Sequence, residues 1–174
     1  MNTEALTALK ERRSTRSFKP QQVTDAELEA VLEAGIYAPS GQGKQARVIV
    51  AVQNKEDIAA LSRMNAAIMG KDIDPYYGAP TILLVLARSD SVTPVEDGCA
   101  ATTYLLAAAH AAGLGACWIN RERQIFDSAE GKALLKKWGL PEDCVGIAAC
   151  ALGYREGDSP APAPRREGNV VRVK

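Results

Sequence analysis

Residues 12–16 gather the side chains with the clearest capacity for chemistry. The segment combines three guanidinium groups with two hydroxyls, carried by Arg12, Arg13, Ser14, Thr15 and Arg16. Arginine side chains match phosphate oxygens through paired hydrogen bonds, and a hydroxyl adds a neutral donor. This composition therefore suits a phosphate monoester. The alternative is a solvated basic cluster that stabilises the C-terminus of the preceding helix.

A glycine-rich loop at residues 39–45 has to be tested against the known phosphate-binding loops. A Walker motif ending at Lys44 needs glycine at position 38 and serine or threonine at position 45, where the chain has Ala38 and Gln45. The turn at residues 113–115 lacks the third glycine of a dinucleotide fingerprint, because position 118 is Trp118. The sequence therefore favours neither an NTPase nor a Rossmann enzyme.

The cysteines and the histidine do not form a recognisable reactive group. The four cysteines include no C-x-x-C pair, and a single histidine leaves a zinc site short of ligands. His110 lies in an alanine-rich helical segment, where a packed side chain is favoured over a general base, and the chain has no G-x-S-x-G motif. We therefore identify no catalytic side chain and no metal ligand.

The overall composition indicates one soluble domain. The 174 residues include 21 basic and 21 acidic side chains, so net charge does not call for a nucleic acid or an anionic membrane as partner. The chain opens with a polar segment rather than a signal peptide, and the apolar run at residues 100–112 is interrupted and alanine-rich. We expect a cytoplasmic protein with no nucleic-acid or membrane partner.

The hydrophobic pattern predicts helices alternating with strands. Helices are expected at residues 3–12, 24–38, 54–64, 95–112 and 127–138, and strands at 48–52, 81–87, 116–119 and 145–152. Capping boxes are expected at Thr24 with Glu27 and at Asp127 with Glu130. The alternation suggests an α+β fold in which a mixed central sheet is sandwiched by helices.

The composition changes after Tyr154. A proline-rich arm follows, and residues 169–173 form a short strand pattern at its end. We therefore divide the chain into a domain at 1–154 and a C-terminal arm at 155–174. The terminal strand needs a sheet edge to pair with, and that edge could belong to another subunit.

Five short motifs, taken in order, resemble the FMN-dependent nitroreductase family and cover nearly the whole chain. They are an N-terminal R-R-S-x-R, an A-P-S-G-x-x-x-Q loop, Y-Y-G-A-P before a strand, A-A-G-L-G-A-C-W-I, and L-G-Y followed by a proline arm with paired basic residues. Each motif is weak alone, and the ordered set is specific. The short length and the segments at 118–121 and 130–135 are similar to a compact subgroup of the family.

The resemblance implies an intertwined homodimer with exchanged C-terminal arms and two FMN sites at the subunit interface. The residues that it assigns to the FMN phosphate and ribityl chain are Arg12, Arg13, Ser14 and Arg16, together with Arg165 or Arg166. Those that it assigns to the cofactor of the partner subunit are Pro39, Ser40, Gly41 and Gln45. Those that it assigns to one flavin face and the pyrimidine edge are Trp118, Ile119, Asn120 and Asn65, with a backbone N–H near Asn120 facing N5.

The implied activity is reduction of nitroaromatics, quinones or similar electron-poor small molecules by NAD(P)H, through a ping-pong hydride transfer at flavin N5. The alternatives are another flavin reaction, such as enone reduction or dehalogenation, and a non-catalytic flavin-binding module. The chain departs from the family pattern at Gly43, where many relatives have asparagine, and at Ala46 and Arg47, where they have Pro-Trp. We expect these departures to alter the acceptor pocket more than flavin binding.

Overall fold

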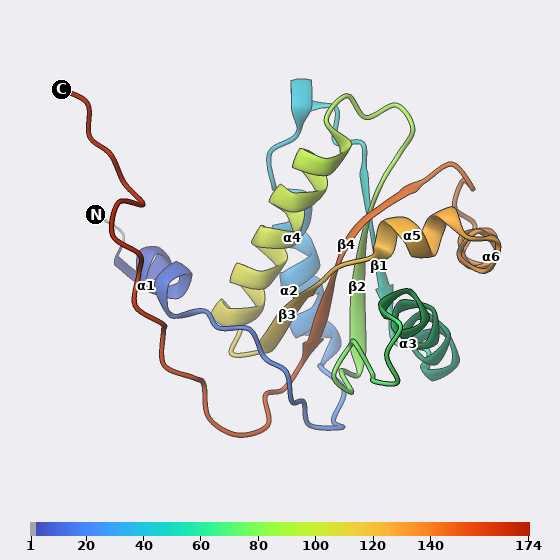
Figure 1. The fold of residues 1–174 in the computed structure, drawn as a ribbon, viewed down its shortest axis with the longest axis horizontal. Helices are drawn as coiled ribbons and strands as arrows, with labels where there is room; N and C mark the ends of the chain where they lie inside the picture. The colour runs from blue at the N-terminus through green and yellow to red at the C-terminus, as the bar shows by residue number, and fades with distance from the viewer. Residues whose placement is uncertain (1–2) are drawn as a thin grey trace.

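Four apolar segments form one β-sheet in the computed structural model, which describes residues 3–174. The strands lie in the order β1-β2-β4-β3 and span Arg47–Val52 (β1), Thr81–Ala87 (β2), Gly115–Ile119 (β3) and Val145–Gly153 (β4). Helices cover both faces of this sheet (Figure 1). The predicted α+β sandwich is therefore confirmed.

The sheet is antiparallel in each of its three strand pairings, which corrects the prediction of a mixed sheet. Among the described residues, parallel pairing is limited to an isolated bridge between Ser14 and Ala116. Val52, at the end of β1, pairs with Ile82, at the start of β2. The helical segment between these strands thus leaves and returns at the same end of the sheet. Alternating strands and helices in a sequence do not reveal this, because strand direction depends on how a connection returns.

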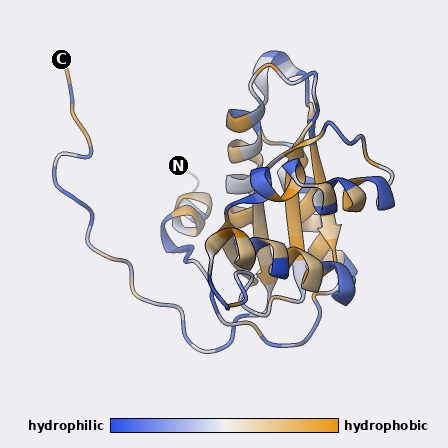
Figure 2. Cartoon of the chain, turned by 45° about the vertical axis from the view of Figure 1, so that its right-hand side comes forward, coloured by the Kyte–Doolittle hydropathy of each residue, from blue (hydrophilic) through white to orange (hydrophobic). Residues whose placement is uncertain are grey.

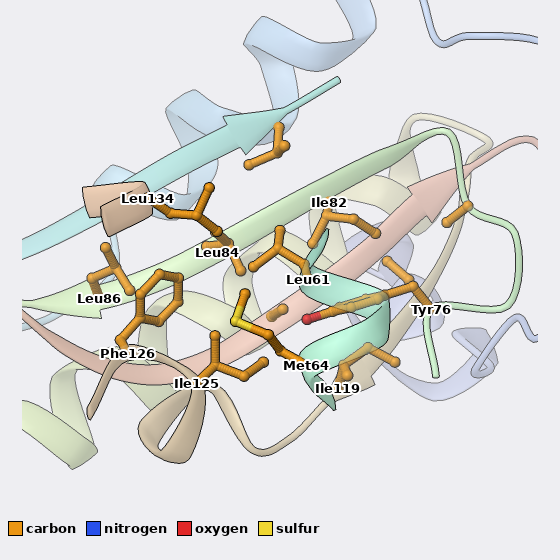
Figure 3. Packing of buried hydrophobic residues seen from close by; sticks show 14 of the residues in the cluster. Leu61, Met64, Tyr76, Ile82, Leu84, Leu86, Ile119, Ile125, Phe126 and Leu134 are labelled. Atoms are coloured by element: carbon orange, nitrogen blue, oxygen red, sulfur yellow. The ribbon is translucent and has the colours of Figure 1, made fainter. Parts of the chain in front are cut away.

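Side chains of the sheet alternate between two hydrophobic cores. Along β2, Ile82, Leu84 and Leu86 face one core, whereas Leu83 and Val85 face the other. Helices α3 (Lys55–Met69), α5 (Glu122–Asp127) and α6 (Ala129–Lys137) cover the first core, which Figure 3 shows in detail. Helices α2 (Asp25–Ile36) and α4 (Pro94–Ala111) cover the second. A strand buried on both faces explains the continuous apolar run at 81–87.

The helix boundaries follow local capping chemistry. The predicted capping box of α2 is present, since Thr24 and Glu27 each bond the other's backbone N–H. Asn54 caps α3, which continues five residues beyond the predicted end at Met64 and stops at Gly70, in the left-handed conformation.

The prediction of Asp127 as a helix cap is wrong. Asp127 is the last residue of α5, a short helix that we did not predict, and its carboxylate accepts a bond from Arg123 at 3.0 Å. Ser128 caps α6 instead, because its hydroxyl accepts the N–H of Gly131 at 3.0 Å. Apolar contacts of Ile125 and Phe126 with the core hold α5 in place.

The C-terminal arm leaves the sandwich after β4 and passes α1 (Thr3–Glu11), as Figures 1 and 2 show. Residues 156–174 are exposed throughout, and residues 169–173 form no strand within the single chain. Pairing of this segment with a partner subunit stays a prediction, as does the division at residue 154. None of the helices in the described part of the chain is long and apolar enough to cross a membrane.

Candidate functional site

The N-terminal basic cluster is fixed against the edge of the sheet. The backbone N–H of Thr15 donates to the carbonyl of Ala116 at 2.9 Å, next to the bridge between Ser14 and Ala116. Thr15 lies so close to Gly115 that a Cβ there would come within 2.7 Å of its hydroxyl oxygen. The close approach requires glycine and sets the position of the arginines on either side.

The C-terminal arm adds Arg165 to the cations of this cluster. A cavity of about 700 Å³ separates the end of α1 from the proline-rich arm. The polar side chains that line it are Lys10, Arg12, Arg13, Ser14, Arg16 and Arg165. No carboxylate lines this cavity in the described part of the chain, so its potential is strongly positive. The two ends of the chain therefore create a site suited to an oxyanion, while the predicted residue Arg166 is exposed and does not line it.

Two polar atoms near this cavity are held in unusual surroundings. One terminal nitrogen of Arg13 donates to the carbonyls of Lys10 and Arg12, each at 2.7 Å, but the Nε of Arg13 is buried without a partner among the described residues. Burial raises the pKa of the Cys117 thiol, although Arg16 and the Ser14 side chain act in the opposite direction. Burial thus disfavours the thiolate, while the positive charge of Arg16 favours it.

A second group of predicted residues meets at the end of β3. Asn65, fully buried in α3, donates from Nδ2 to the carbonyl of Asn120 at 2.9 Å and accepts from Nε of Arg121 at 2.7 Å. Trp118 donates from its indole to the Asn120 side chain at 2.8 Å. Arg121 has φ of 85°, a conformation that normally favours glycine. Hydrogen bonds from the side chains of Asn65 and Trp118 to Asn120 therefore fix the conformation of this turn.

This turn borders a small cavity of about 130 Å³, lined by Trp118, Ile119, Asn120 and Arg121 together with Tyr77 and three other residues. Asn65 does not line it, since its amide is used for the turn itself. Sequence reasoning assigned Asn65 to the edge of a ligand, whereas in the single chain it positions the backbone of Asn120.

A buried acid lies behind the turn. Glu122 is fully buried, its Oε1 accepts the hydroxyl of Tyr76 at 3.2 Å, and its Oε2 has no partner among the described residues. Burial raises the pKa of Glu122 to about 7 and raises that of Tyr76 well above its ordinary value. Figure 3 shows Tyr76 within the core beside Leu61 and Met64. Sequence reasoning missed this pair, because nothing local marks Glu122 as buried.

The glycine-rich loop is anchored by α4. Asp97, at the start of α4, accepts the N–H of Gly41 at 2.8 Å, and the Ser40 hydroxyl accepts the N–H of Gln45 at 3.0 Å. Gln42 and Gln45 both have positive φ, at 54° and 52°. Sequence reasoning also missed Asp97, whose only local signal is a carboxylate in the first turn of an apolar helix.

Within one chain, the loop does not join the other two groups. It borders a separate cavity of about 590 Å³, whose lining includes Pro39, Ser40, Gln45 and Arg47. The predicted residues thus fall into three sites in the single chain: the basic cavity, the turn after β3 and the loop. Assembly of these sites around one ligand would need a second subunit, as the sequence prediction implies.

The chain is an α+β sandwich with a cationic cavity between its N-terminal segment and its C-terminal arm. Residues 9–154 match the nitroreductase family, so the chain belongs to this family. A relative from Archaeoglobus fulgidus, named provisionally as an NADH dehydrogenase/NAD(P)H nitroreductase, is 29% identical over 157 residues, which cover 87% of this chain and 85% of the relative.

Two solved structures are similar to this chain over nearly its full length. A nitroreductase with bound FMN from Bacteroides fragilis superposes with a TM-score of 0.90 at 29% identity, covering 98% of this chain and 99% of the other. A nitroreductase with bound FMN from Desulfitobacterium hafniense has a TM-score of 0.88 at 25% identity, covering 100% of both chains. The similarity therefore includes the C-terminal arm as well as the sandwich.

Proposed function

We propose that the chain is an FMN-dependent oxidoreductase that uses NAD(P)H to reduce nitroaromatics, quinones or similar electron-poor small molecules. The observation that carries this proposal is the cavity where Arg12, Arg13 and Arg16 meet Arg165. Its cationic lining and the FMN bound by two similar nitroreductases support the same ligand.

The residues of the cavity fit a phosphate monoester. Guanidinium groups and the Ser14 hydroxyl supply the donors that a dianionic phosphate accepts. The absence of carboxylates from the described lining removes any competing negative charge. In this proposal, Arg12, Arg13, Ser14 and Arg16 hold the phosphate, and Arg165 closes the cavity from the arm.

The turn after β3 is suited to the redox end of the cofactor. Bound FMN would supply the hydride-transfer chemistry. Asn65 keeps the Asn120 backbone in one orientation, and Arg121 contributes positive charge beside it. Fixed donors and charge of this kind stabilise developing negative charge without reorganisation. Beneath the turn, burial raises the pKa of Glu122 to about 7, and its Oε1 accepts the Tyr76 hydroxyl.

Donor and acceptor would bind in turn at one open face. The chain has no dinucleotide fingerprint that would provide a separate nicotinamide site. We also propose that the protein acts as a homodimer, in which Pro39, Ser40, Gly41 and Gln45 contact the cofactor held by the partner subunit. The anchoring of this loop by Asp97 supports a fixed position for such contacts.

Flavin content tests the proposal most directly. The purified protein is expected to be yellow and to release FMN on denaturation, as measured by absorbance and mass spectrometry. The double variant R12A/R16A should lose most of this flavin, because the phosphate loses two charged partners at about 1.5–3 kcal/mol each. The matched control R63A/R123A removes two exposed arginines that pair with Glu130 and Asp127, far from the cavity in sequence. A colourless wild-type protein, or equal flavin in the two double variants, would refute this assignment.

The acceptor is identified by NAD(P)H oxidation. The flavin-loaded protein should consume NADH or NADPH when a nitroarene or a quinone is added, with parallel initial-rate lines typical of a ping-pong cycle. Activity with an enone or a halogenated ring alone would favour the other flavin reactions. Flavin binding without oxidation of either nicotinamide would indicate a non-catalytic module.

A further inference from the structure

Glu122 is the most deeply buried carboxyl group of the described chain. The other two buried carboxylates, Asp57 and Asp97, each accept hydrogen bonds at both oxygens. The Oε1 of Glu122 accepts the Tyr76 hydroxyl at 3.2 Å, whereas its Oε2 is buried without a partner among the described residues. Neither helix capping nor an ion pair within the described chain therefore accounts for an acid at this position.

Two side chains connect Glu122 to the turn after β3. The Tyr76 ring reaches into the core with its hydroxyl oxygen at the inner end (Figure 3), where it meets the Glu122 carboxyl. Burial raises the pKa of Tyr76, and a hydrogen bond with the Asn65 side chain acts in the opposite direction. The Asn65 amide also donates to the carbonyl of Asn120 at 2.9 Å and accepts from Nε of Arg121 at 2.7 Å. Tyr76 and Asn65 thus lead from the carboxyl to both residues of the turn.

The charged groups around Glu122 leave Arg121 as its main electrostatic neighbour. Burial raises the pKa of Glu122, and Arg121 acts in the opposite direction. Asp74, after α3, contributes to the raised pKa of Tyr76, although less than burial and Glu122. The other ionisable side chains of α3, α5 and α6 are exposed or ion-paired, namely Lys55, Glu56, Asp57, Arg63, Arg123, Asp127, Glu130, Lys132, Lys136 and Lys137. Burial raises the pKa of the thiols on and beside the neighbouring strands, which are Cys117, Cys144 and Cys150.

Ionisation of Glu122 would change the turn in two ways. A carboxylate accepts a stronger hydrogen bond from Tyr76 than a neutral carboxyl does, which alters the contacts of that hydroxyl with Asn65. A buried negative charge also offsets the positive charge of Arg121, and water screens it less than it would screen a surface charge. The turn would then stabilise a neighbouring negative charge less strongly.

We propose that Glu122 controls, through Tyr76 and Asn65, how strongly the Asn120 turn stabilises negative charge, and that its protonation is thereby linked to reduction of bound flavin. The second part rests on the proposed function, which places the redox end of FMN at this turn. Protonated Glu122 leaves the charge of Arg121 available and favours reduction, whereas ionised Glu122 opposes it. Because linkage is reciprocal, reduction also raises the affinity of Glu122 for its proton. Glu122 is a positioning residue, since it acts through the turn and is itself inaccessible.

Nuclear magnetic resonance of the purified, oxidised protein tests the coupling itself. The ¹³C signal of the Glu122 carboxyl and the backbone ¹⁵N signals of Asn120 and Arg121 are followed from pH 5 to pH 9. We expect the three signals to titrate together with a midpoint of about 7, and the ¹⁵N changes to be absent from E122Q. D127N is the matched control, because Asp127 is an exposed carboxylate of the same helix that pairs with Arg123. It should keep the wild-type response.

The variant Y76F tests the route. It keeps the aromatic ring and removes the hydroxyl that joins Glu122 to Asn65. In Y76F the ¹⁵N signals of Asn120 and Arg121 should change by less than half as much as in the wild type. A full response in Y76F would overturn a route through Tyr76. Constant Asn120 and Arg121 signals in the wild type would overturn the whole proposal, even if E122Q fails to fold.

The reduction potential of the bound flavin tests the link to the cofactor. Spectroelectrochemical titration gives the potentials of wild type, E122Q and D127N at pH 5 and at pH 9. Relative to E122Q, the wild-type potential should fall by about 30 mV between these pH values, which is a tenfold change in the equilibrium constant of a two-electron couple. D127N should follow the wild type.

Failure of the link and failure of the proposed function give different results. A difference between wild type and E122Q that is the same at both pH values would overturn the link to flavin. A protein that binds no flavin would refute the proposed function and the link together. In that case the ¹⁵N titration of Asn120 and Arg121 still decides whether Glu122 controls the turn.

Discussion

Glu122 allows a quantitative test of the core beneath the Asn120 turn. Its carboxyl is fully buried, and burial raises its pKa from 4.5 to about 7. Between these pH values the unfolded chain is ionised at Glu122 while the folded protein keeps the proton. The folded state therefore binds more protons, and the free energy of unfolding falls as pH rises through this window. The loss in free energy of unfolding caused by Glu122 is absent below about pH 4.5 and complete above about pH 7.

The magnitude follows from the same shift. A change of one pKa unit corresponds to about 1.4 kcal/mol, so the displacement from 4.5 to about 7 amounts to about 3 kcal/mol. Other carboxylates do not mimic the effect. Hydrogen bonds lower the pKa of Glu27 through Thr24 and of Asp57 through Lys137. Their stabilisation is present above their unfolded pKa values and is lost only as pH falls below that range, outside the interval from pH 5 to 8.

The variant E122Q removes the titration and keeps the shape of the side chain. Its amide oxygen can still accept the Tyr76 hydroxyl, which wild-type Oε1 accepts at 3.2 Å. We expect urea unfolding of wild-type protein to lose about 2–3 kcal/mol between pH 5 and pH 8 relative to E122Q. Circular dichroism at constant ionic strength, protein concentration and flavin occupancy provides the measurement.

The slope, rather than the absolute stability, decides this prediction. The amide of E122Q places a polar group where Oε2 has no partner within the described chain, and the cost of this is the same at every pH. E33Q is the matched control, since Glu33 is an exposed residue of α2. It should follow the wild-type slope. Identical slopes in E122Q and wild type would show that Glu122 is ionised in the folded protein.

Three further predictions concern the elements that position the site. N65A should destabilise the fold by roughly 2 kcal/mol and weaken flavin retention, because it frees the Asn120 carbonyl and Arg121 together; urea unfolding and flavin release measure the two effects. G115A should cost about 1–3 kcal/mol in the same unfolding assay and reduce flavin affinity, because the added Cβ displaces Thr15; unchanged flavin affinity would contradict it. Truncation after Gly157 removes the exposed arm and should shift the proposed dimer towards monomer in sedimentation experiments; a truncated chain that remains dimeric would contradict a role of the arm in assembly.

The sequence predicts the strands well because their signal is local. The run at 81–87 is apolar and β-branched, and it becomes β2 with the predicted bounds. The six residues of α5 have no such signal, because their polar sequence gains stability from the contacts of Ile125 and Phe126 with the distant core. Strand direction was also not predictable, since pairing of Val52 with Ile82 depends on the return of the chain after α3.

The residues of the candidate site also divide into those with a local sequence signal and those that depend on tertiary packing. The cluster at 12–16 is visible as composition, and the cavity it shares with Arg165 follows from the path of the arm past α1. Glu122 is a charged residue in an ordinary sequence context, and its significance arises only from burial. Local sequence reports which groups carry charge, whereas tertiary packing determines which of them lose water without gaining a partner.

Glu122 and Arg47 each bury a polar atom that has no partner within the described residues, and the two side chains are compensated differently. A carboxyl group can respond to burial by keeping its proton, and Glu122 does so at pH values below about 7. The Arg47 guanidinium instead gains hydrogen bonds, because its Nη2 donates to the carbonyls of Ile36 and Ala38. Compensation for Glu122 is therefore pH-dependent, while compensation for Arg47 comes from the two carbonyls at the end of α2.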